Sequence, residues 1–452
     1  MATDSAARGE QGRPGMALRA WLSQPVDAAG VAAFRILFGA ALLLSTLRFA
    51  AYGWIRELYI DPVFHFSYRG FEWVRPWPAP WLYLHFVVIG ASALAVAVGW
   101  RTRWAAGLFC LAFTYVELLE KAAYLNHYYL VSLMAALLIV VPSASMWSLD
   151  ARRLGSRPLV ARWCYLLLGG QVAVVYSFAG VAKIGEDWLL HAEPLRTWLQ
   201  AYADLPFVGP WLATPFAAYA MSWFGCIYDL SIVGWLLWRP SRPFALLAVF
   251  GFHGAIWILF PVGVFSLVMV ICASLLCSPS WPRRFLGRHK SPPSQLGPDS
   301  SPQRLAPWAV AAILSYLGFQ IAWPLRHFAI PGDVNWSEEG FRFAWRVMLV
   351  EKSGQVEFRV HADGEHWIDF PREQLTPLQH KMMSTAPDMI HEYALHLAQR
   401  LRARGHREVQ VYADAYAALN GRPSQRLIDP TIDLAAVPRR AGSGSFVVPL
   451  HR

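Results

Sequence analysis

Charged residues are scarce in this 452-residue chain, at 15% of the composition, while 56% of the residues are hydrophobic and 14% are aromatic. This scarcity excludes an ordinary soluble globular protein, in which about a quarter of the residues are charged. Several uncharged runs approach twenty residues, which is long enough to cross a bilayer as a helix. The sequence therefore predicts a polytopic α-helical membrane protein.

Cysteine is also rare, and its placement excludes two further kinds of site. The five cysteines all lie in apolar segments without a CxxC pair, at Cys110, Cys164, Cys226, Cys272 and Cys277. They are predicted to be small buried hydrophobic residues, not a disulfide framework or metal ligands. No HExxH-type spacing is present, so we expect no metal. The first twenty residues hold no apolar h-region, and we expect no cleavable signal peptide.

Nine membrane helices are predicted, with eight as the alternative because one segment is long and another short: 28–50, 80–100, 104–120, 125–142, 163–183, 210–238, 244–260, 262–278 and 306–323. Alternate short loops are basic, and they hold Arg8, Arg13, Arg19, Arg101, Arg103, Arg152, Arg153, Arg157, Arg239, Arg242, Arg283, Arg284, Arg288 and Lys290. The positive-inside rule assigns these loops to the cytoplasm. The net charge of +10 thus reflects topology and not a nucleic-acid partner.

This topology divides the chain into three parts. Residues 1–27 are predicted to be a cytoplasmic tail, 28–323 a transmembrane domain and 324–452 an extracytoplasmic α+β domain. Within the second part, the Ser/Pro-rich stretch 285–304 is typical of a disordered cytoplasmic loop.

The pattern of the C-terminal part combines strands with a helix. Alternating residues over 341–370, broken by Ser-Gly and Asp-Gly, predict a meander of about three strands. A helical stretch is predicted from Thr376, and an amphipathic helix ends at Gly405. Residues 409–419 predict a further strand, followed by an Asn-Gly turn and a last extended piece.

Ionisable residues in the apolar runs are the candidates for function. Only five of the forty basic residues are lysines, and Lys183 directly follows the uncharged run 163–182. It is either a lysine whose ammonium reaches the lipid headgroups or one whose free amine acts as a base in a water-poor pocket. His253, near the middle of its helix, is either a hydrogen-bonded structural group or a functional one. Asp229 has no evident partner in the sequence.

Six segments in a fixed order show a resemblance to a known family: YLNHYYL, WSLD, FAGVAKIGEDW, GFHGAIWILFPVGVF, WSEEGFRFAWRVM and VYADAYAALNGRPSQRLIDPTIDL. Together with their spacing, they make the chain resemble the vitamin K-dependent γ-glutamyl carboxylases and the wider HTTM membrane-domain group. The resemblance extends from about residue 28 to about residue 438.

The resemblance implies a reaction and its participants. The lysine matching Lys183 is the family's base, which deprotonates vitamin K hydroquinone, while Asn126, His127 and His253 match active-site positions that can hydrogen-bond the quinol or a developing oxyanion. Oxygenation of the quinol to the epoxide then produces a base strong enough for the glutamate γ-C–H, and the carbanion takes up CO2. The implied cofactor is reduced vitamin K, as phylloquinol or menaquinol, with O2 and CO2 as co-substrates and no metal. The implied partners are a glutamate-containing peptide or protein client and the lipid membrane.

The substrate side is expected around Trp336, Trp345, Arg426 and Tyr412, because that region resembles the part that holds the glutamate. From the residues alone, both tryptophans could equally be core aromatics. Arg426 could form a local ion pair with Asp429 instead of binding a substrate carboxylate.

Departures from the family leave other functions open. The long lumenal extension and the extramembrane cysteine of animal members are missing, and Phe341 and Ala344 replace hydroxyl-bearing residues. We expect a short bacterial-type member in the inner membrane, with its C-terminal domain in the periplasm and peptide recognition reduced. The alternatives are a quinol epoxidase or oxidoreductase without carboxylation, a quinone-binding protein or transporter, and a membrane anchor. Transporters are expected to show internal repeats, and the sequence has none, which argues against the transporter.

Overall fold

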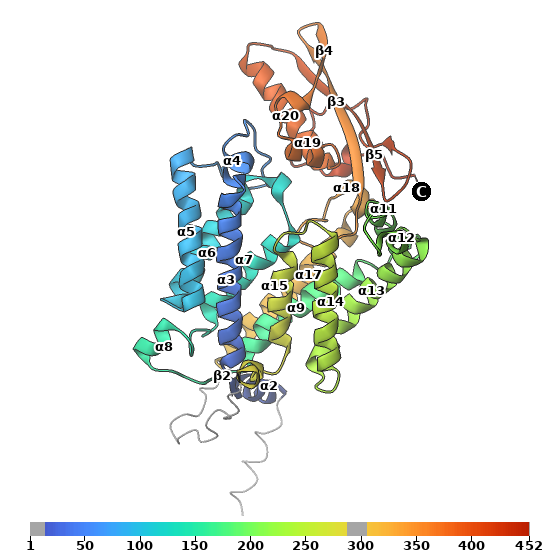
Figure 1. Cartoon of the computed structure of the whole chain (residues 1–452). Helices are drawn as coiled ribbons and strands as arrows, with labels where there is room; N and C mark the ends of the chain where they lie inside the picture. The colour runs from blue at the N-terminus through green and yellow to red at the C-terminus, as the bar shows by residue number, and fades with distance from the viewer. Residues whose placement is uncertain (1–13, 287–304, 452) are drawn as a thin grey trace, which may run out of the picture.

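The computed structural model describes residues 14–286 and 305–451, and Figure 1 labels its elements. Within these residues six helices are long and apolar enough to span a membrane: α3 (Ala29–Ala51), α5 (Ala79–Val98), α9 (Trp163–Val181), α13 (Pro215–Leu237), α14 (Arg242–Leu259) and α17 (Pro307–Ala322) with the 3-10 turn Trp323–Ala329. Three further helices, α6 (Thr102–Leu119) and the shorter α7 (Asn126–Val140) and α15 (Phe265–Ala273), pack among them. Each of the nine predicted segments therefore contains a helix, while the count of eight or nine spans stays a prediction.

Short elements connect these helices at both ends of the bundle: α2 (Pro14–Ser23), α4 (Trp54–Tyr59), α8 (Leu149–Leu154), α10 (Glu186–Leu189), α11 (Leu195–Gln200), α12 (Gly209–Leu212) and α16 (Trp281–Phe285). A small sheet pairs β1 (Pro25–Asp27) with β2 (Leu159–Ala161). In Figure 1, α2, β2 and α8 lie at the end of the bundle opposite the C-terminal sheet. Arg8, Arg13, Arg288, Lys290 and the predicted disordered loop after Leu286 lie outside the described residues.

Small residues set the spacing of the helices. At Gly39 of α3, an added Cβ would lie 2.5 Å from the Ala97 nitrogen of α5. At the same end, the buried Arg35 donates hydrogen bonds to the carbonyl oxygens of Val96 (2.7 Å) and Ser143 (3.2 Å). Without water to compete, such close contacts and satisfied polar groups are what hold membrane helices together.

A four-stranded sheet in the order β4-β3-β5-β6 forms the C-terminal part, with antiparallel pairs throughout. Its strands are β3 (Lys352–Ala362), β4 (Glu365–Asp369), β5 (Val409–Leu419) and β6 (Gln425–Arg426). Alternate side chains, including Val356, Phe358 and Val360, are buried in a core shared with α20 (Pro387–Ala403). The predicted helix starting after Thr376 is α19 (Pro377–Met383), which a capping box begins.

The predicted first strand of the meander is wrong. Residues 341–349 form turns, with positive φ at Phe343 (62°), Trp345 (57°) and Met348 (55°). The segment lies between the helices and the sheet, so its alternate side chains pack in two different surroundings. Several of its backbone amides and carbonyls form hydrogen bonds with side chains instead of with a neighbouring strand. Tyr124 Oη accepts from the Phe343 amide (2.7 Å), and Asn126 Nδ2 donates to the Arg346 carbonyl (3.1 Å).

The predicted Ser353–Gly354 turn is also wrong, because both residues lie inside β3. Glycine is required there for another reason, since the Ser384 backbone lies where a side chain at residue 354 would be. The Asp-Gly turn between β3 and β4 and the end of α20 before Gly405 are confirmed.

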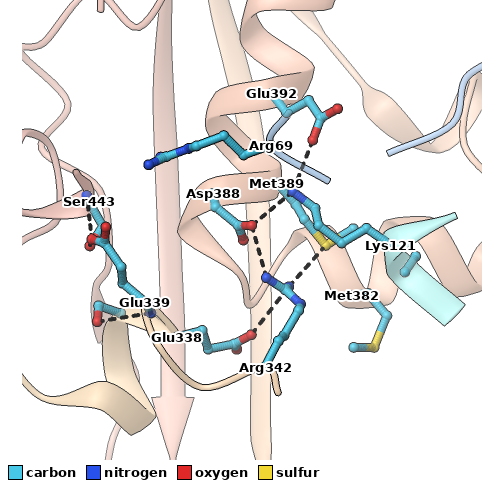
Figure 2. A network of polar contacts seen from close by, with 12 residues as sticks. Arg69, Lys121, Glu338, Glu339, Arg342, Met382, Asp388, Met389, Glu392 and Ser443 are labelled. Atoms are coloured by element: carbon cyan, nitrogen blue, oxygen red, sulfur yellow. Dashed lines mark hydrogen bonds and ion pairs between the residues drawn. The ribbon is translucent and has the colours of Figure 1, made fainter. Parts of the chain in front are cut away.

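A polar network joins the C-terminal part to the helices (Figure 2). Lys121, in the short connection between α6 and α7, lies 2.8 Å from Asp388 Oδ2 and 3.0 Å from Glu392 Oε2. Arg342 contacts the same Asp388 oxygen at 2.9 Å. Ser67 donates to Glu392 through both its amide and its hydroxyl, at 2.8 Å each. Because Lys121 is buried, this network positions the outer part on the bundle.

The stabilising effect of Asp388 is expected to disappear at low pH. Burial alone would raise the pKa of Asp388, but the nearby charges of Arg342 and Lys121 hold that pKa below its ordinary range. A carboxyl group whose pKa is lowered on folding stabilises the fold above its unfolded pKa, near 3.9, and loses this effect as the pH falls towards its folded pKa. We expect the difference in thermal midpoint between wild type and Asp388→Asn to be constant from pH 7 to about pH 5 and to shrink below about pH 4. A difference that stays the same down to pH 3 would contradict this account.

Candidate active site

Lys183 is buried at the end of α9, and its partner is Asp229 of α13. The Nζ atom lies 2.8 Å from Asp229 Oδ2 and donates to the Ala179 carbonyl at 3.2 Å. The two residues are 4% and 5% exposed. The interpretation of Lys183 as a lipid-facing lysine is therefore wrong, and Asp229, unexplained from the sequence, is its counter-ion.

A glycine allows this pair to form. Helices α9 and α13 approach so closely at Gly180 that an added Cβ would lie 2.9 Å from the Leu230 nitrogen. Leu230 directly follows Asp229, so this approach brings the carboxylate beside the turn that carries Lys183. The ion pair depends on backbone packing as much as on the two side chains.

One apolar cavity of about 70 Å³ contains this pair. Lys183, Asp229 and His253 line it together with aromatic side chains, among them Trp188 and Phe265. The ring of Trp188 lies 5.2 Å from Lys183 Nζ, and its Nε1 donates to the Ser222 carbonyl at 2.8 Å. Val347 and Met348, from the segment before β3, also line the cavity, so the outer part of the chain contributes to its wall.

His253 of α14 is fully buried in this wall. Its Nε2 lies 3.0 Å from the Tyr176 hydroxyl, while its Nδ1 has no hydrogen-bond partner among the described residues. A buried polar atom without a partner is unusual and costly in a folded protein. The structure thus provides the structural hydrogen bond expected for His253 and leaves its other ring nitrogen without a partner among the described residues.

The two other expected active-site residues lie outside the cavity. His127 packs against Phe265, with ring centroids 5.6 Å apart, and Phe265 packs against His253 at 5.8 Å, so one phenyl ring separates the two histidines. Asn126 accepts from the Tyr124 hydroxyl (3.0 Å) and donates to the Arg346 carbonyl. The structure therefore brings Lys183 and His253 together, keeps His127 one ring away, and uses Asn126 to hold the 341–349 segment.

The expected substrate residues lie away from this cavity. Trp336 is buried and donates to the Val448 carbonyl (2.7 Å), while the buried Trp345 stacks on Tyr129 with centroids 5.0 Å apart. Both indoles are core side chains, as the alternative interpretation of the two tryptophans as core aromatics predicts.

The two expected residues on the sheet have local partners. Arg426 pairs with Asp414 (2.8 Å), so the local ion pair exists, but its partner is not Asp429. Tyr412 lies against Arg359 and His361 on the sheet face away from α20. Neither residue lines the cavity that holds Lys183.

Two family profiles match the chain. The profile of the HTTM domain covers residues 23–281, and that of the lumenal domain of vitamin K-dependent gamma-carboxylase covers residues 305–452. The chain belongs to the vitamin K-dependent γ-carboxylase family. In this carboxylase-family protein the second match begins before α17, ahead of the boundary predicted at residue 324. No solved structure matches the chain.

Within the described part of this carboxylase-family protein, no group of three or more His, Cys, Asp or Glu is arranged to hold a metal ion. Sequence reasoning missed two features of the site, the Lys183–Asp229 pair and the contribution of Val347 and Met348. The signal for the first was present, since an ionisable residue in a membrane helix is a functional candidate by default.

Proposed function

We propose that this protein uses vitamin K hydroquinone, O2 and CO2 to carboxylate glutamate side chains of a peptide or protein client, with Lys183 as the base that accepts the phenolic proton. The observation that carries the proposal is the burial of Lys183 against Asp229 in an apolar cavity that also contains His253. Membership of the carboxylase family supports the reaction class.

The Lys183–Asp229 pair is suited to handling one proton. A lysine acts as a base only as the free amine, and the Nζ–Oδ2 contact of 2.8 Å is short enough for direct transfer of its proton to the carboxylate. The pair has a net charge of zero both as ammonium with carboxylate and as amine with carboxylic acid. The proton transfer therefore adds no net charge to the apolar cavity. The amine of Lys183 is then free to accept a proton from a phenol.

The lining of the cavity also suits a quinol, and its walls must move apart to admit one, because the open volume is only about 70 Å³. Its aromatic walls suit a flat apolar ring, and the unpartnered Nδ1 of His253 offers one hydrogen bond to a ring oxygen. When bound, the quinol supplies on oxygenation the strong base that a glutamate γ-C–H requires. Tyr176 orients the imidazole of His253 through the 3.0 Å contact, and the apolar lining disfavours water that would quench a carbanion.

The proposed orientation places the C-terminal part outside the cytoplasm. The described basic loops lie at the bundle end opposite the sheet, and the matching profile is named for a lumenal domain. We further propose that the membrane is a bacterial inner membrane and that the quinol is menaquinol. This proposal is based on the composition, which is rich in arginine and poor in lysine.

The test follows two products at once. Purified protein in detergent receives vitamin K hydroquinone or menaquinol, O2, labelled bicarbonate and a short glutamate peptide, with the matching glutamine peptide as control. We expect quinone epoxide together with label fixed only in the glutamate peptide. Epoxide without label would instead support the quinol epoxidase, and neither product with either quinol would refute the proposed enzyme.

A further inference from the structure

A second cavity, of about 400 Å³, lies beside the Lys183 turn. Ala182 and Arg346 line it, whereas their chain neighbours Lys183 and Val347 line the first cavity. The same two backbone segments therefore separate the two cavities. A group bound in the second cavity lies one layer of chain from the proposed base.

Arg346 is a charged residue of this second cavity, and one of its side-chain nitrogens has no hydrogen-bond partner among the described residues. It is 9% exposed, and its Nη2 donates to Asn335 Oδ1 at 3.0 Å. Its Nε is buried and makes no hydrogen bond with any described residue. An arginine remains charged in proteins and presents its donors as a rigid fork that matches a carboxylate.

Burial and Asp333 define the electrostatics of this arginine. Burial lowers the pKa of Arg346 from its ordinary value, and the charge of Asp333, which also lines the cavity, opposes that effect. Asp333 Oδ1 accepts from the Asn335 amide at 2.8 Å and begins the short helix α18 (Val334–Ser337). Asp333 thereby fixes Asn335, and the Asn335 side chain in turn orients the guanidinium.

The backbone around Arg346 is strained and held in place. Trp345 and Met348 both have positive φ, a conformation that side chains other than glycine rarely adopt. Asn126, at the end of α7 nearest the outer part, holds the Arg346 carbonyl at 3.1 Å. Such strain persists where the surroundings over-determine it, and it clusters at ligand clamps.

We propose that Arg346, oriented by Asn335, binds the γ-carboxylate of the client glutamate. This inference rests on the proposed function and names its carboxylate-binding residue. The γ-carbon bonded to that carboxylate would then be held beside the two segments that bound the Lys183 cavity. Removing a proton from this carbon adds a second negative charge next to the carboxylate, which a paired guanidinium stabilises.

Binding and turnover both test this assignment. A fluorescent glutamate peptide and its glutamine counterpart are titrated into wild type, Arg346→Gln and the control Arg404→Gln, which changes an exposed arginine at the end of α20. We expect wild type and the control to prefer glutamate by about 10- to 100-fold and Arg346→Gln to lose the preference. In turnover, Arg346→Gln should raise KM for the glutamate peptide, whereas Arg404→Gln should keep the wild-type KM.

An unchanged preference in Arg346→Gln would overturn the inference, as would loss of the preference in Arg426→Gln alone. If Arg346→Gln does not fold, Asn335→Ala replaces it, with a smaller loss of preference expected and an unchanged preference again overturning the inference. Peptide binding needs no turnover, so a wild type that binds the glutamate peptide selectively without making epoxide would refute the proposed enzyme and leave the Arg346 assignment supported.

Discussion

The Lys183→Met variant is expected to lose epoxide formation and carboxylation together, by about 10²–10⁴-fold, which is the usual contribution of a general base. Both products should fall because the phenolic proton must leave before either forms. The measurement is the double assay for epoxide and fixed label at saturating hydroquinone. Lys381→Ala, which removes an exposed lysine of α19, is the matched control and should retain the wild-type rates.

A second pair of variants separates catalysis from folding. Lys183→Met alone leaves the Asp229 carboxylate buried and unpaired, and breaking a buried pair in this way costs about 3–5 kcal/mol. Lys183→Met/Asp229→Leu removes both charges and should recover most of that stability, because an apolar pair replaces an ionic pair at little cost. Activity should remain lost in the double variant. Recovery of epoxide formation there would show that Lys183 is not the base.

The Lys121→Met variant is expected to loosen the C-terminal part from the helices. Lys121 is 7% exposed at its side chain and neutralises Glu392, which is 5% exposed, together with Asp388. Removing it leaves the buried Glu392 with only the half-exposed Arg439 as a cation. We therefore expect a loss of about 3 kcal/mol, the low end for breaking a buried pair, and faster proteolysis within 324–451.

The control for this variant is Arg439→Gln, which removes a half-exposed partner of the same Glu392 and should cost no more than about 1 kcal/mol. Equal proteolysis of Lys121→Met and wild type would contradict a docking role for the network in Figure 2. Because Val347 and Met348 line the Lys183 cavity, carboxylation should decline as the outer part loosens.

Local pattern was sufficient to predict most elements of the fold. The apolar runs are helices, and β5 and α20 follow their periods because each buries one face against a single core. The segment 341–349 could not be predicted, since its alternation arises from two different cores. Trp345 packs in the main core of the helices, whereas Leu349 packs in a separate cluster with Trp188 and Leu212. The apolar and polar residues of this segment therefore alternate as in a strand, although its backbone is bent by turns.

The site was predictable only in part. Lys183 and His253 stood out because a polar side chain within an apolar run has few purely structural roles. Asp229 lies 46 residues from Lys183, and their contact arises from helix packing that no local pattern encodes. Arg346 was missed because an arginine in an alternating segment resembles a surface residue. Its backbone is held by Asn126 and its guanidinium by Asn335, and no local pattern shows these contacts.

The glycine at residue 180 has a consequence for how this protein can vary. It has no functional group, yet any larger residue there would push α9 from α13 and lengthen the Lys183–Asp229 contact. The geometry of the proposed base is therefore controlled by a residue that takes no part in the proposed reaction. Sequence drift at this position would abolish the proposed activity while Lys183, Asp229 and His253 all remained in the sequence.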